Sequence, residues 1–356
     1  MREDFSLDTI QSLKARAGHL CSFPGCHAPT SGPSQESKTQ TANTGVAAHI
    51  CAASQGKGAR RRLDLSKFDK RRLSHYSNGI WMCETHAKLI DTDEVRFTAE
   101  MLVRWRELAE LRASLSQETG RTVNVHLRQG HEIPLAQVEK VVTQNGVDVM
   151  NDMCDAILDS CIVDVWGKEI GYAVRDVVAE LMDNAFTHGG ASQFTLNIDQ
   201  NQILIKSDDL PYSFGQLLAD SQHHGGQKAA EALMKLNDRL ITSYRREDNY
   251  NVLEISFVTS SEQVLSTTAC AVEYSDFITT LEFSDQLPAM YSNCETIYVV
   301  VGPRQHLVPS VARKLSTRLR NLAAAHKRIV LIGSAISEGV TSMLKDEFPD
   351  MQIMQV

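Results

Sequence analysis

The spacing of apolar residues predicts a helix soon after residue 97. Apolar side chains recur there at intervals of three and four positions, at Met101, Leu102, Trp105, Leu108, Ala109 and Leu115. Thr98 fits the N-cap of this helix, and Gly120 can end it. Residues 15–97 lack such periodicity and are rich in Cys, His, Gly and Arg. We expect the apolar face of the helix to close a small domain formed by these residues.

The middle of the chain shows a helical pattern over residues 168–188, followed by FTLNID (194–199) and QILIKS (202–207) on either side of a polar turn. Apolar residues alternate in both hexapeptides, so this part predicts a helix and then a β-hairpin. We expect a further helix over 226–240 and a strand over 251–259.

The C-terminal part alternates short apolar runs with helical patterns. The apolar runs lie at 296–301, 328–333 and 351–356, and the helical patterns lie near 307–325 and 335–347. This βαβαβ order predicts a small α/β unit with parallel strands.

Length and composition place these elements in a multidomain α+β protein. At 356 residues the chain exceeds one ordinary domain, and its 42% hydrophobic and 22% charged residues are typical of globular proteins. Periodicity is weak over 118–150. We therefore expect a first domain at 1–117, a linker at 118–150, a second domain at 151–262 and a third at 263–356. The N-terminus lacks a signal-peptide pattern, and no run of about 18 apolar residues occurs, so we expect a cytoplasmic protein without a membrane partner.

Cysteine spacing indicates a structural metal site. In a reducing compartment the eight cysteines are poor candidates for disulfides. Cys21 and Cys26 form a C-x4-C pair, and Cys83 and His86 form a C-x2-H pair, which is the ligand set of a tetrahedral Zn²⁺ ion. His27 could take the place of Cys26. The cysteines without such spacing are expected to be ordinary interior thiols: Cys51, Cys154, Cys161, Cys270 and Cys294.

One basic stretch stands out against the net charge of −8. Residues 57–72 contain eight cations and two anions, which suggests contact with a polyanion confined to the first domain. The alternative is a solvated loop. The expected DNA contacts are Lys57, Arg60, Arg61, Arg62, Lys70, Arg71 and Arg72.

The segments VAAHI (46–50), SNGIWMC (77–83) and ETHAKLID (84–91), followed by the predicted helix, resemble the HNH endonuclease superfamily. The resemblance covers about residues 15–110 and implies a zinc-stapled ββα-metal domain that hydrolyses DNA phosphodiesters with Mg²⁺ or Mn²⁺. It implies that His49 is the general base that activates water and that Asn78 orients the loop carrying that base.

Two positions depart from the HNH pattern. Ala48 stands where many members have an acidic metal ligand, and Ala87 stands where the final histidine is often found. Asp91 is our preferred substitute ligand, with Asp93 as an alternative and His75 as a weaker candidate. The competing interpretation of His49 is a histidine packed in a small core.

The predicted helix at 168–188 carries polar residues on one face. Glu180, Asn184 and His188 are spaced four residues apart. This pattern resembles the N-box of GHKL ATPases, in which the glutamate polarises the attacking water and the asparagine binds Mg²⁺. The resemblance covers about residues 165–260 and implies an α/β sandwich that binds ATP with Mg²⁺. The competing interpretation is a solvated helix face, or a degenerate site kept as a scaffold.

The other GHKL boxes are less complete. In SDDLPYSF, Asp208 matches the adenine-binding aspartate, but Leu210 and Tyr212 replace glycines. In HHGGQKAAEAL (223–233), Gly225 and Gly226 could present backbone N–H groups to phosphate at a helix N-terminus.

These resemblances together predict a DNA endonuclease gated by nucleotide state, a combination similar to bacterial anti-phage defence proteins. One alternative is a DNA-binding regulator that does not cleave and carries a degenerate ATPase module. A protein kinase or anti-sigma-like enzyme is another, although no phosphoacceptor histidine motif is recognisable. The C-terminal unit is similar in pattern to STAS-like domains, and we expect it to serve regulation or homo-oligomerisation.

Overall fold

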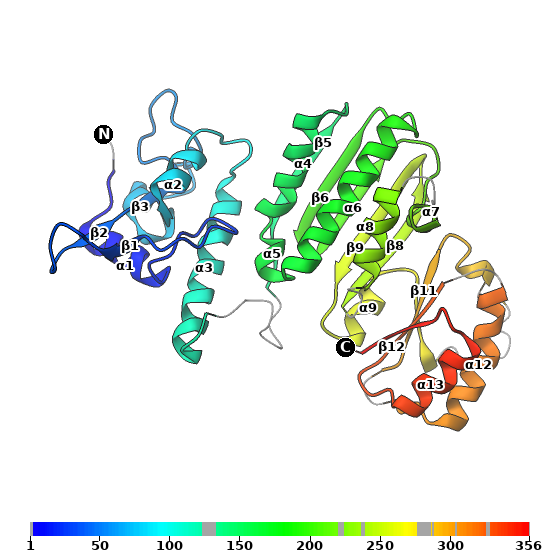
Figure 1. The fold of residues 1–356 in the computed structure, drawn as a ribbon. Coiled ribbons are helices and arrows are strands. Elements are labelled where there is room, and N and C mark those ends of the chain that lie inside the picture. Colours follow the sequence, from blue (N-terminus) through cyan, green and yellow to red (C-terminus); the bar gives the residue numbers. More distant parts are fainter. Residues whose placement is uncertain are drawn as a thin grey trace. The chain divides into compact units, whose positions relative to one another are not determined.

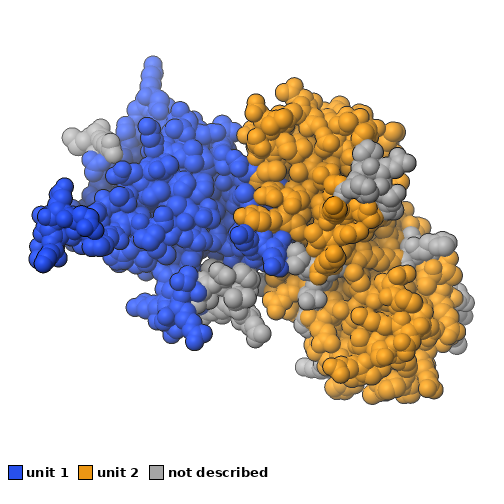
Figure 2. All heavy atoms as spheres, in the orientation of Figure 1, with its two compact units in different colours: residues 1–138, 155–171 blue, residues 139–154, 172–356 orange. Residues whose placement is uncertain are grey.

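The computed structural model describes residues 3–122, 133–219, 224–235, 239–275, 286, 288–302, 305–324 and 328–355. The chain divides into two units, shown in different colours in Figure 2. Unit 1 contains Met1–Val138 and Asp155–Gly171, and unit 2 contains Glu139–Cys154 and Tyr172–Val356. The protein is therefore a multidomain α+β protein, as the sequence predicts.

Unit 1 is built around a short antiparallel strand pair and the helix that follows it. Its elements are α1 Leu7–Arg16, β1 Ser31–Pro33, β2 Thr41–Asn43, β3 Gly45–His49, η1 Lys70–Ser74, η2 Tyr76–Asn78, β4 Gly79–Cys83, α2 Glu84–Ile90 and α3 Ala99–Thr119. β3 pairs with β4 so that Gly45 opposes Cys83 and His49 opposes Gly79. The pairing of β3 with β4, and the start of α2 directly after β4, therefore place His49, Cys83 and the residues of α2 in one small domain.

Glycine is required where β3 crosses Trp81. A Cβ atom on Gly45 would lie 2.1 Å from the Trp81 ring, so a larger residue would push the two strands apart. The indole Nε1 donates to Thr30 Oγ1 over 2.8 Å, which satisfies the polar edge of a buried ring.

Helix α3 confirms the prediction from apolar spacing. Thr98 Oγ1 accepts a hydrogen bond from Met101 N over 3.2 Å, and Gly120 ends the helix in the left-handed conformation at φ 66°. The predicted apolar face is buried at Met101, Leu102, Trp105, Leu108, Ala109 and Leu115.

The segment 155–171 belongs to unit 1, although the sequence placed it in the second domain. It contains α5, Ile162–Val165, together with the end of α4, Val147–Asp159, and the start of α6, Lys168–Thr187. Arg96 Nε donates to Asp159 Oδ2 over 2.7 Å, and Trp105 Nε1 donates to the Asp159 carbonyl over 2.8 Å. The interval expected to be a linker contains β5, Leu135–Val142, and the start of α4. The partly polar strand β5 gives a weak hydrophobic pattern because its buried and exposed residues do not alternate regularly.

A five-stranded sheet has the order β5-β6-β7-β9-β8, and its four strands after β5 lie in unit 2. The remaining strands are β6 Phe194–Gln200, β7 Gln202–Ser207, β8 Leu240–Glu247 and β9 Tyr250–Phe257, and the pairs β6–β7, β7–β9 and β9–β8 are antiparallel. Helices α7, Phe214–Ala219, and α8, His224–Lys235, follow β7, and Figure 1 shows α6 and α8 along one face of the sheet.

The predicted β6–β7 hairpin and the strand near 251–259 are thus confirmed, whereas β8 is a strand that the sequence analysis missed. A signal for it was available. Asp248 and Asn249 have φ values of 45° and 73°, as the two-residue turn of a hairpin requires, and Asp-Asn pairs suit such a turn.

The C-terminal part of unit 2 contains a parallel sheet in the order β10-β11-β12-β13. Its strands are β10 Ala271–Glu273, β11 Thr296–Val300, β12 Arg328–Ile332 and β13 Gln352–Met354. The described residues of this part also form helices α9 Ser261–Thr267, α12 Pro309–Ala324 and α13 Glu338–Glu347. The predicted βαβαβ order is confirmed, whereas the three-residue β10 and helix α9 were not predicted.

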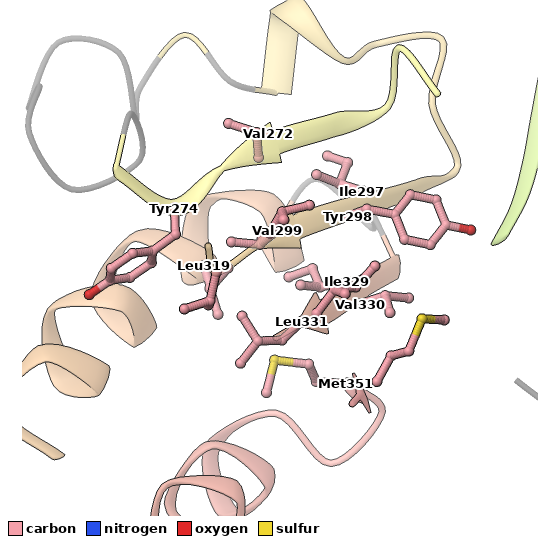
Figure 3. Close-up of a cluster of buried hydrophobic side chains, with 14 of the residues drawn as sticks. Val272, Tyr274, Ile297, Tyr298, Val299, Leu319, Ile329, Val330, Leu331 and Met351 are labelled. Atoms are coloured by element: carbon pink, nitrogen blue, oxygen red, sulfur yellow. The ribbon is translucent and has the colours of Figure 1, made fainter. Parts of the chain in front are cut away.

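Apolar residues run without alternation along β11 and β12 because both faces of these strands are buried. Figure 3 shows Ile297, Val299, Ile329 and Leu331 within this core. On β11, Tyr298 is also buried, and its hydroxyl donates to the Thr242 carbonyl and accepts from Thr242 N. Burial raises the pKa of Tyr298 to about 12.

One cysteine prediction is wrong. Cys270 and Cys294, expected to be separate interior thiols, form a disulfide with their Cα atoms 5.8 Å apart. They precede the neighbouring parallel strands β10 and β11, so pairing of those strands brings the two residues together. A separation of 24 residues gave no local signal of this pairing. Among the described residues, no helix is both long and apolar enough to cross a membrane.

Candidate functional site

The four predicted metal ligands converge in unit 1. The ligand atoms of Cys21, Cys26, Cys83 and His86 all lie within 4.8 Å of one another. His86 Nδ1 lies 3.5 Å from Cys21 Sγ and 3.2 Å from Cys83 Sγ. Tetrahedral Zn²⁺ with bonds of about 2.0–2.3 Å separates its ligand atoms by about 3.5 Å. This cluster could hold a metal ion and is compatible with structural zinc.

Local structure explains the convergence. Cys83 is the N-cap of α2 and His86 lies in its first turn, so the C-x2-H pair is fixed by one helix start. Cys21 and Cys26 lie in the turn closed by the Leu20–Pro29 bridge. Phe23 stacks on the His86 ring with centroids 3.9 Å apart. Burial lowers the pKa of His86, which keeps the imidazole neutral and able to donate a lone pair.

His27 does not belong to this cluster. Its Nε2 lies 3.0 Å from Asp164 Oδ1, on the segment of unit 1 that contains α5. Arg112 Nη2 lies 4.0 Å from the same oxygen. The structure therefore favours Cys26 as the fourth ligand, and it gives His27 a structural partner that sequence analysis did not predict.

Next to α2 lies a cleft of about 780 Å³, which we call the first cleft. His49 and Asp91, which are 42 positions apart in the sequence, both line it, together with Lys57 and Arg60. Ala48 and Ala87 line the same cleft. The predicted base and the predicted acidic substitute are thus brought to one surface by folding.

Sequence analysis missed Glu84, which also lines the first cleft. A signal existed in the spacing, because residues 84, 87, 88 and 91 fall on one face of a helix. Glu84 gives the cleft a second carboxylate beside Asp91.

Phe5 and Glu3 contact His49 at the end of β3. Its ring stacks on Phe5 with centroids 3.9 Å apart, and its Nε2 lies 3.0 Å from the Glu3 carbonyl oxygen. A carbonyl can only accept a hydrogen bond, so a neutral His49 carries its proton on Nε2. Nδ1 is then the atom with the lone pair that a general base needs.

Asn78 is buried, and its side chain binds the backbone after His49. Its Nδ2 donates to the carbonyls of Cys51 over 2.8 Å and of Leu73 over 3.0 Å, and its Oδ1 accepts from Cys51 N over 2.8 Å. An amide side chain satisfies both backbone groups of Cys51, which fixes the segment that leaves β3.

The basic stretch divides into structural and exposed residues. Arg61 corrects the sequence analysis, because its side chain is only 5% exposed. It donates to the carbonyls of Ile50 and Ile90 and lies 3.1 Å from Asp91 Oδ1. Arg61 is therefore a structural residue that is not available to a phosphate group.

Other cations of this stretch remain at the surface. Arg71 is 94% exposed and lies 3.8 Å from Asp69, and Lys70 lies 2.8 Å from Glu3. Arg60 donates to the Thr92 carbonyl while lining the first cleft. These contacts leave the prediction of DNA binding untested.

The two weaker candidates have structural roles. His75 Nδ1 lies 2.9 Å from Ser77 Oγ and caps the short helix η2. Asp93 Oδ1 accepts hydrogen bonds from Val95 N and Arg96 N. Neither residue lines the first cleft.

In unit 2, the predicted phosphate glycines lie against the predicted N-box glutamate. A Cβ atom on Gly226 would be 2.6 Å from Leu217 and 3.5 Å from Glu180 Oε2. A Cβ atom on Gly225 would be only 2.7 Å from Glu180 Oε1. Glu180 and Asn184 are both half-buried on α6. Folding thus joins two of the boxes that the sequence analysis had identified separately.

Asp208 has a different role from the one expected. Its Oδ1 accepts from Ser192 N and Gln193 N over 2.8 Å each, and its Oδ2 accepts from Ser192 Oγ. Burial raises the pKa of Asp208, but these hydrogen bonds outweigh that effect and lower it below its usual value. Asp208 therefore fixes the loop before β6.

Asp209, which sequence analysis passed over, is the buried carboxylate at this position. Its Oδ1 accepts from Ser207 Oγ and Asn251 Nδ2 over 2.6 Å each. A Cβ atom on Gly189 would be 2.7 Å from its Oδ2.

No protein-family profile, curated protein or solved structure matches this chain in comparisons with known proteins.

Proposed function

We propose that this protein is a metal-dependent DNA endonuclease of the HNH type, controlled by an ATP-binding module in unit 2. The observation that carries the proposal is the first cleft, where His49 and Asp91 lie among Lys57 and Arg60. The neighbouring cluster of Cys21, Cys26, Cys83 and His86 would hold a structural Zn²⁺ ion in place of a larger core.

His49 would act as the general base. Its Nδ1 takes a proton from water, which then attacks the phosphorus atom of a DNA phosphodiester. Asn78 holds the backbone of Cys51, so the ring keeps its position during proton transfer. Lys57 and Arg60 offer positive charge to the phosphate bound in the same cleft.

The first cleft can accept Mg²⁺ or Mn²⁺ with few protein ligands. Such ions in proteins are commonly held by one or two carboxylates, with water and substrate phosphate completing the shell. Asp91 and Glu84 are the two carboxylates of the cleft. Among the described residues, His, Cys and carboxylate atoms converge in threes or more only at the Cys/His cluster, so the cleft would rely on DNA for its remaining ligands. The bound ion would stabilise the charge that develops on the phosphate.

Plasmid cleavage tests this proposal. Purified protein should cut DNA with Mg²⁺ or Mn²⁺, and His49→Ala should lower the rate by at least about 100-fold while retaining zinc. His75→Ala is the matched control, because His75 lies outside the cleft. Asp91→Ala should also lose activity, but excess Mn²⁺ should restore part of it, which it cannot do for His49→Ala. Wild-type rates in both cleft variants would overturn the mechanism.

The nucleotide part of the proposal rests on Glu180 and the glycines of α8. Glu180 would polarise the attacking water, Asn184 would hold the Mg²⁺ of ATP, and the backbone of Gly225 and Gly226 would face phosphate. Calorimetry should show that Asn184→Ala abolishes ATP binding and that Glu180→Gln keeps binding but prevents hydrolysis. If ATP controls the nuclease, both variants should change the rate of DNA cleavage. The effect would come from the altered nucleotide state of unit 2, because neither residue belongs to the proposed DNA site.

A second candidate function is a DNA-binding regulator without cleavage. It is favoured by Ala48 and Ala87 in the first cleft and by the ion pair between Arg61 and Asp91, which competes with a metal ion for the carboxylate. DNA binding without cleavage at any concentration of Mg²⁺ or Mn²⁺ would support this alternative.

A further inference from the structure

A second cleft of unit 1, of about 520 Å³, lies beyond the residues that follow His49. Ile50, Cys51 and Asn78 form part of its wall, and Arg62, Phe68 and Arg72 line it. The proposed hydrolysis does not use this cleft, although Asn78 contributes to its wall and Arg62 and Arg72 are expected DNA contacts.

Two of its cations are not neutralised by carboxylates. Arg104 is paired with Glu107 over 2.8 Å, but Arg62 donates its Nε only to the Ala59 carbonyl. Arg72 stacks on Phe68 with its guanidinium carbon 4.5 Å from the ring centre. Asp64 also lines this cleft, but it is paired with Lys67 over 3.6 Å. No ion pair of Arg62 or Arg72 occurs among the described residues, so both guanidinium groups can bind a phosphate.

Phe68 makes the cleft more than an anion site. Phe68 is 40% exposed, although phenylalanine is among the residue types most often buried. An aromatic ring with a guanidinium plane against it is a surface on which a nucleobase stacks, whatever its sequence. Glu100, at the first turn of α3, lines the same cleft and can accept a hydrogen bond from a base amino group.

The second cleft is connected to the first by consecutive residues. His49 and Arg61 line the first cleft, while Ile50 and Arg62 line the second. One strand can therefore present a phosphate to the first cleft and a neighbouring nucleotide to the second.

We propose that the second cleft binds a nucleotide of the DNA strand beside the one presented to His49. The base stacks on Phe68 and Arg72, and the phosphate lies between Arg62 and Arg72. This assignment rests on the proposed DNA-binding function, and it adds a site that positions the strand. Because any base can stack on an aromatic ring, the site binds DNA without selecting a sequence.

The test measures binding in the His49→Ala background, where DNA is not cut. Fluorescent oligonucleotides carry one abasic position, moved along the strand. Phe68→Ala should weaken binding of intact DNA about tenfold, as loss of one base stack predicts, whereas Phe68→Tyr should keep the affinity. When the abasic nucleotide occupies the position that faces Phe68, the affinity of the Phe68→Ala variant for DNA should equal that of its His49→Ala parent.

Arg71 supplies a matched comparison for Arg72. Arg72→Gln should weaken binding of intact DNA more than of DNA with the abasic position, while Arg71→Gln should lower both affinities equally through lost charge alone. Zinc content and circular dichroism confirm that each variant is folded. If His49→Ala binds DNA but Phe68→Ala has no effect at any position, the second cleft is not a nucleotide site. If His49→Ala binds no DNA, the proposed function fails together with this inference.

Discussion

A Cβ atom on Gly225 would lie 2.7 Å from Glu180 Oε1, so the start of α8 lies directly against the carboxylate of α6. The two residues are 45 positions apart in the sequence. Their contact means that any side chain at position 225 must displace Glu180, which is the residue expected to act on water in the proposed ATP site.

Gly225→Ala should therefore move the α8 backbone that is proposed to face phosphate as well as Glu180. It should weaken ATP binding at least about tenfold and destabilise unit 2 by about 1–3 kcal/mol. Gly339→Ala is the matched control, since Gly339 is likewise the second residue of a helix and has open space around it. Alanine there should be neutral or stabilising by up to about 1 kcal/mol. Thermal melting and ATP calorimetry check both variants. Equal behaviour of the two would contradict the importance of the contact.

The Cys/His cluster should bind one Zn²⁺ ion per chain, as elemental analysis would measure. Cys83→Ser should lose the ion and unfold the first domain, because the metal ties the start of α2 to the Cys21–Cys26 turn. Cys154→Ser should retain zinc, since Cys154 is half-buried and lies outside the cluster. Well-folded protein without zinc would count against the structural role.

Replacement of Arg61 should damage stability more than DNA binding. Arg61→Gln leaves the carbonyls of Ile50 and Ile90 without their donor and should cost about 2–4 kcal/mol of unfolding free energy. Arg71→Gln should change stability by less than about 0.5 kcal/mol, because Arg71 is 94% exposed. Urea denaturation of the two variants measures this difference. If their midpoints agree, the assigned role of Arg61 is wrong.

Asp208 should make unit 2 sensitive to acid. Its pKa is lowered in the folded protein, so its contribution to stability is present above the unfolded pKa of about 3.9 and is lost as pH falls through the lower folded value. Asp208→Asn should cost about 1 kcal/mol at pH 7, since a partly exposed carboxylate is screened by solvent. The variant should lose less stability than the parent between pH 5 and pH 3, in melts at each pH. If both proteins lose the same stability between pH 5 and pH 3, the role assigned to Asp208 is wrong.

Much of the fold could be predicted because local patterns encode local structure. The face of α3, its Thr98 cap and its Gly120 end lie within one stretch of chain, and so do the strands and helices of the C-terminal sheet. The metal ligands were equally accessible, because Cys21 with Cys26 and Cys83 with His86 are close pairs fixed by short turns.

Only the tertiary structure decided which polar groups are already in use. The sequence lists His27, Arg61 and Asp208 as possible ligands or contacts, but Asp164, the Ile50 carbonyl and the Ser192–Gln193 backbone occupy them. It likewise gave no sign that Cys270 meets Cys294 or that Glu180 meets Gly225. The physical reason is the same in each case. Residue type and spacing set what a side chain can do, whereas its partner is chosen by packing between segments that are distant in the chain.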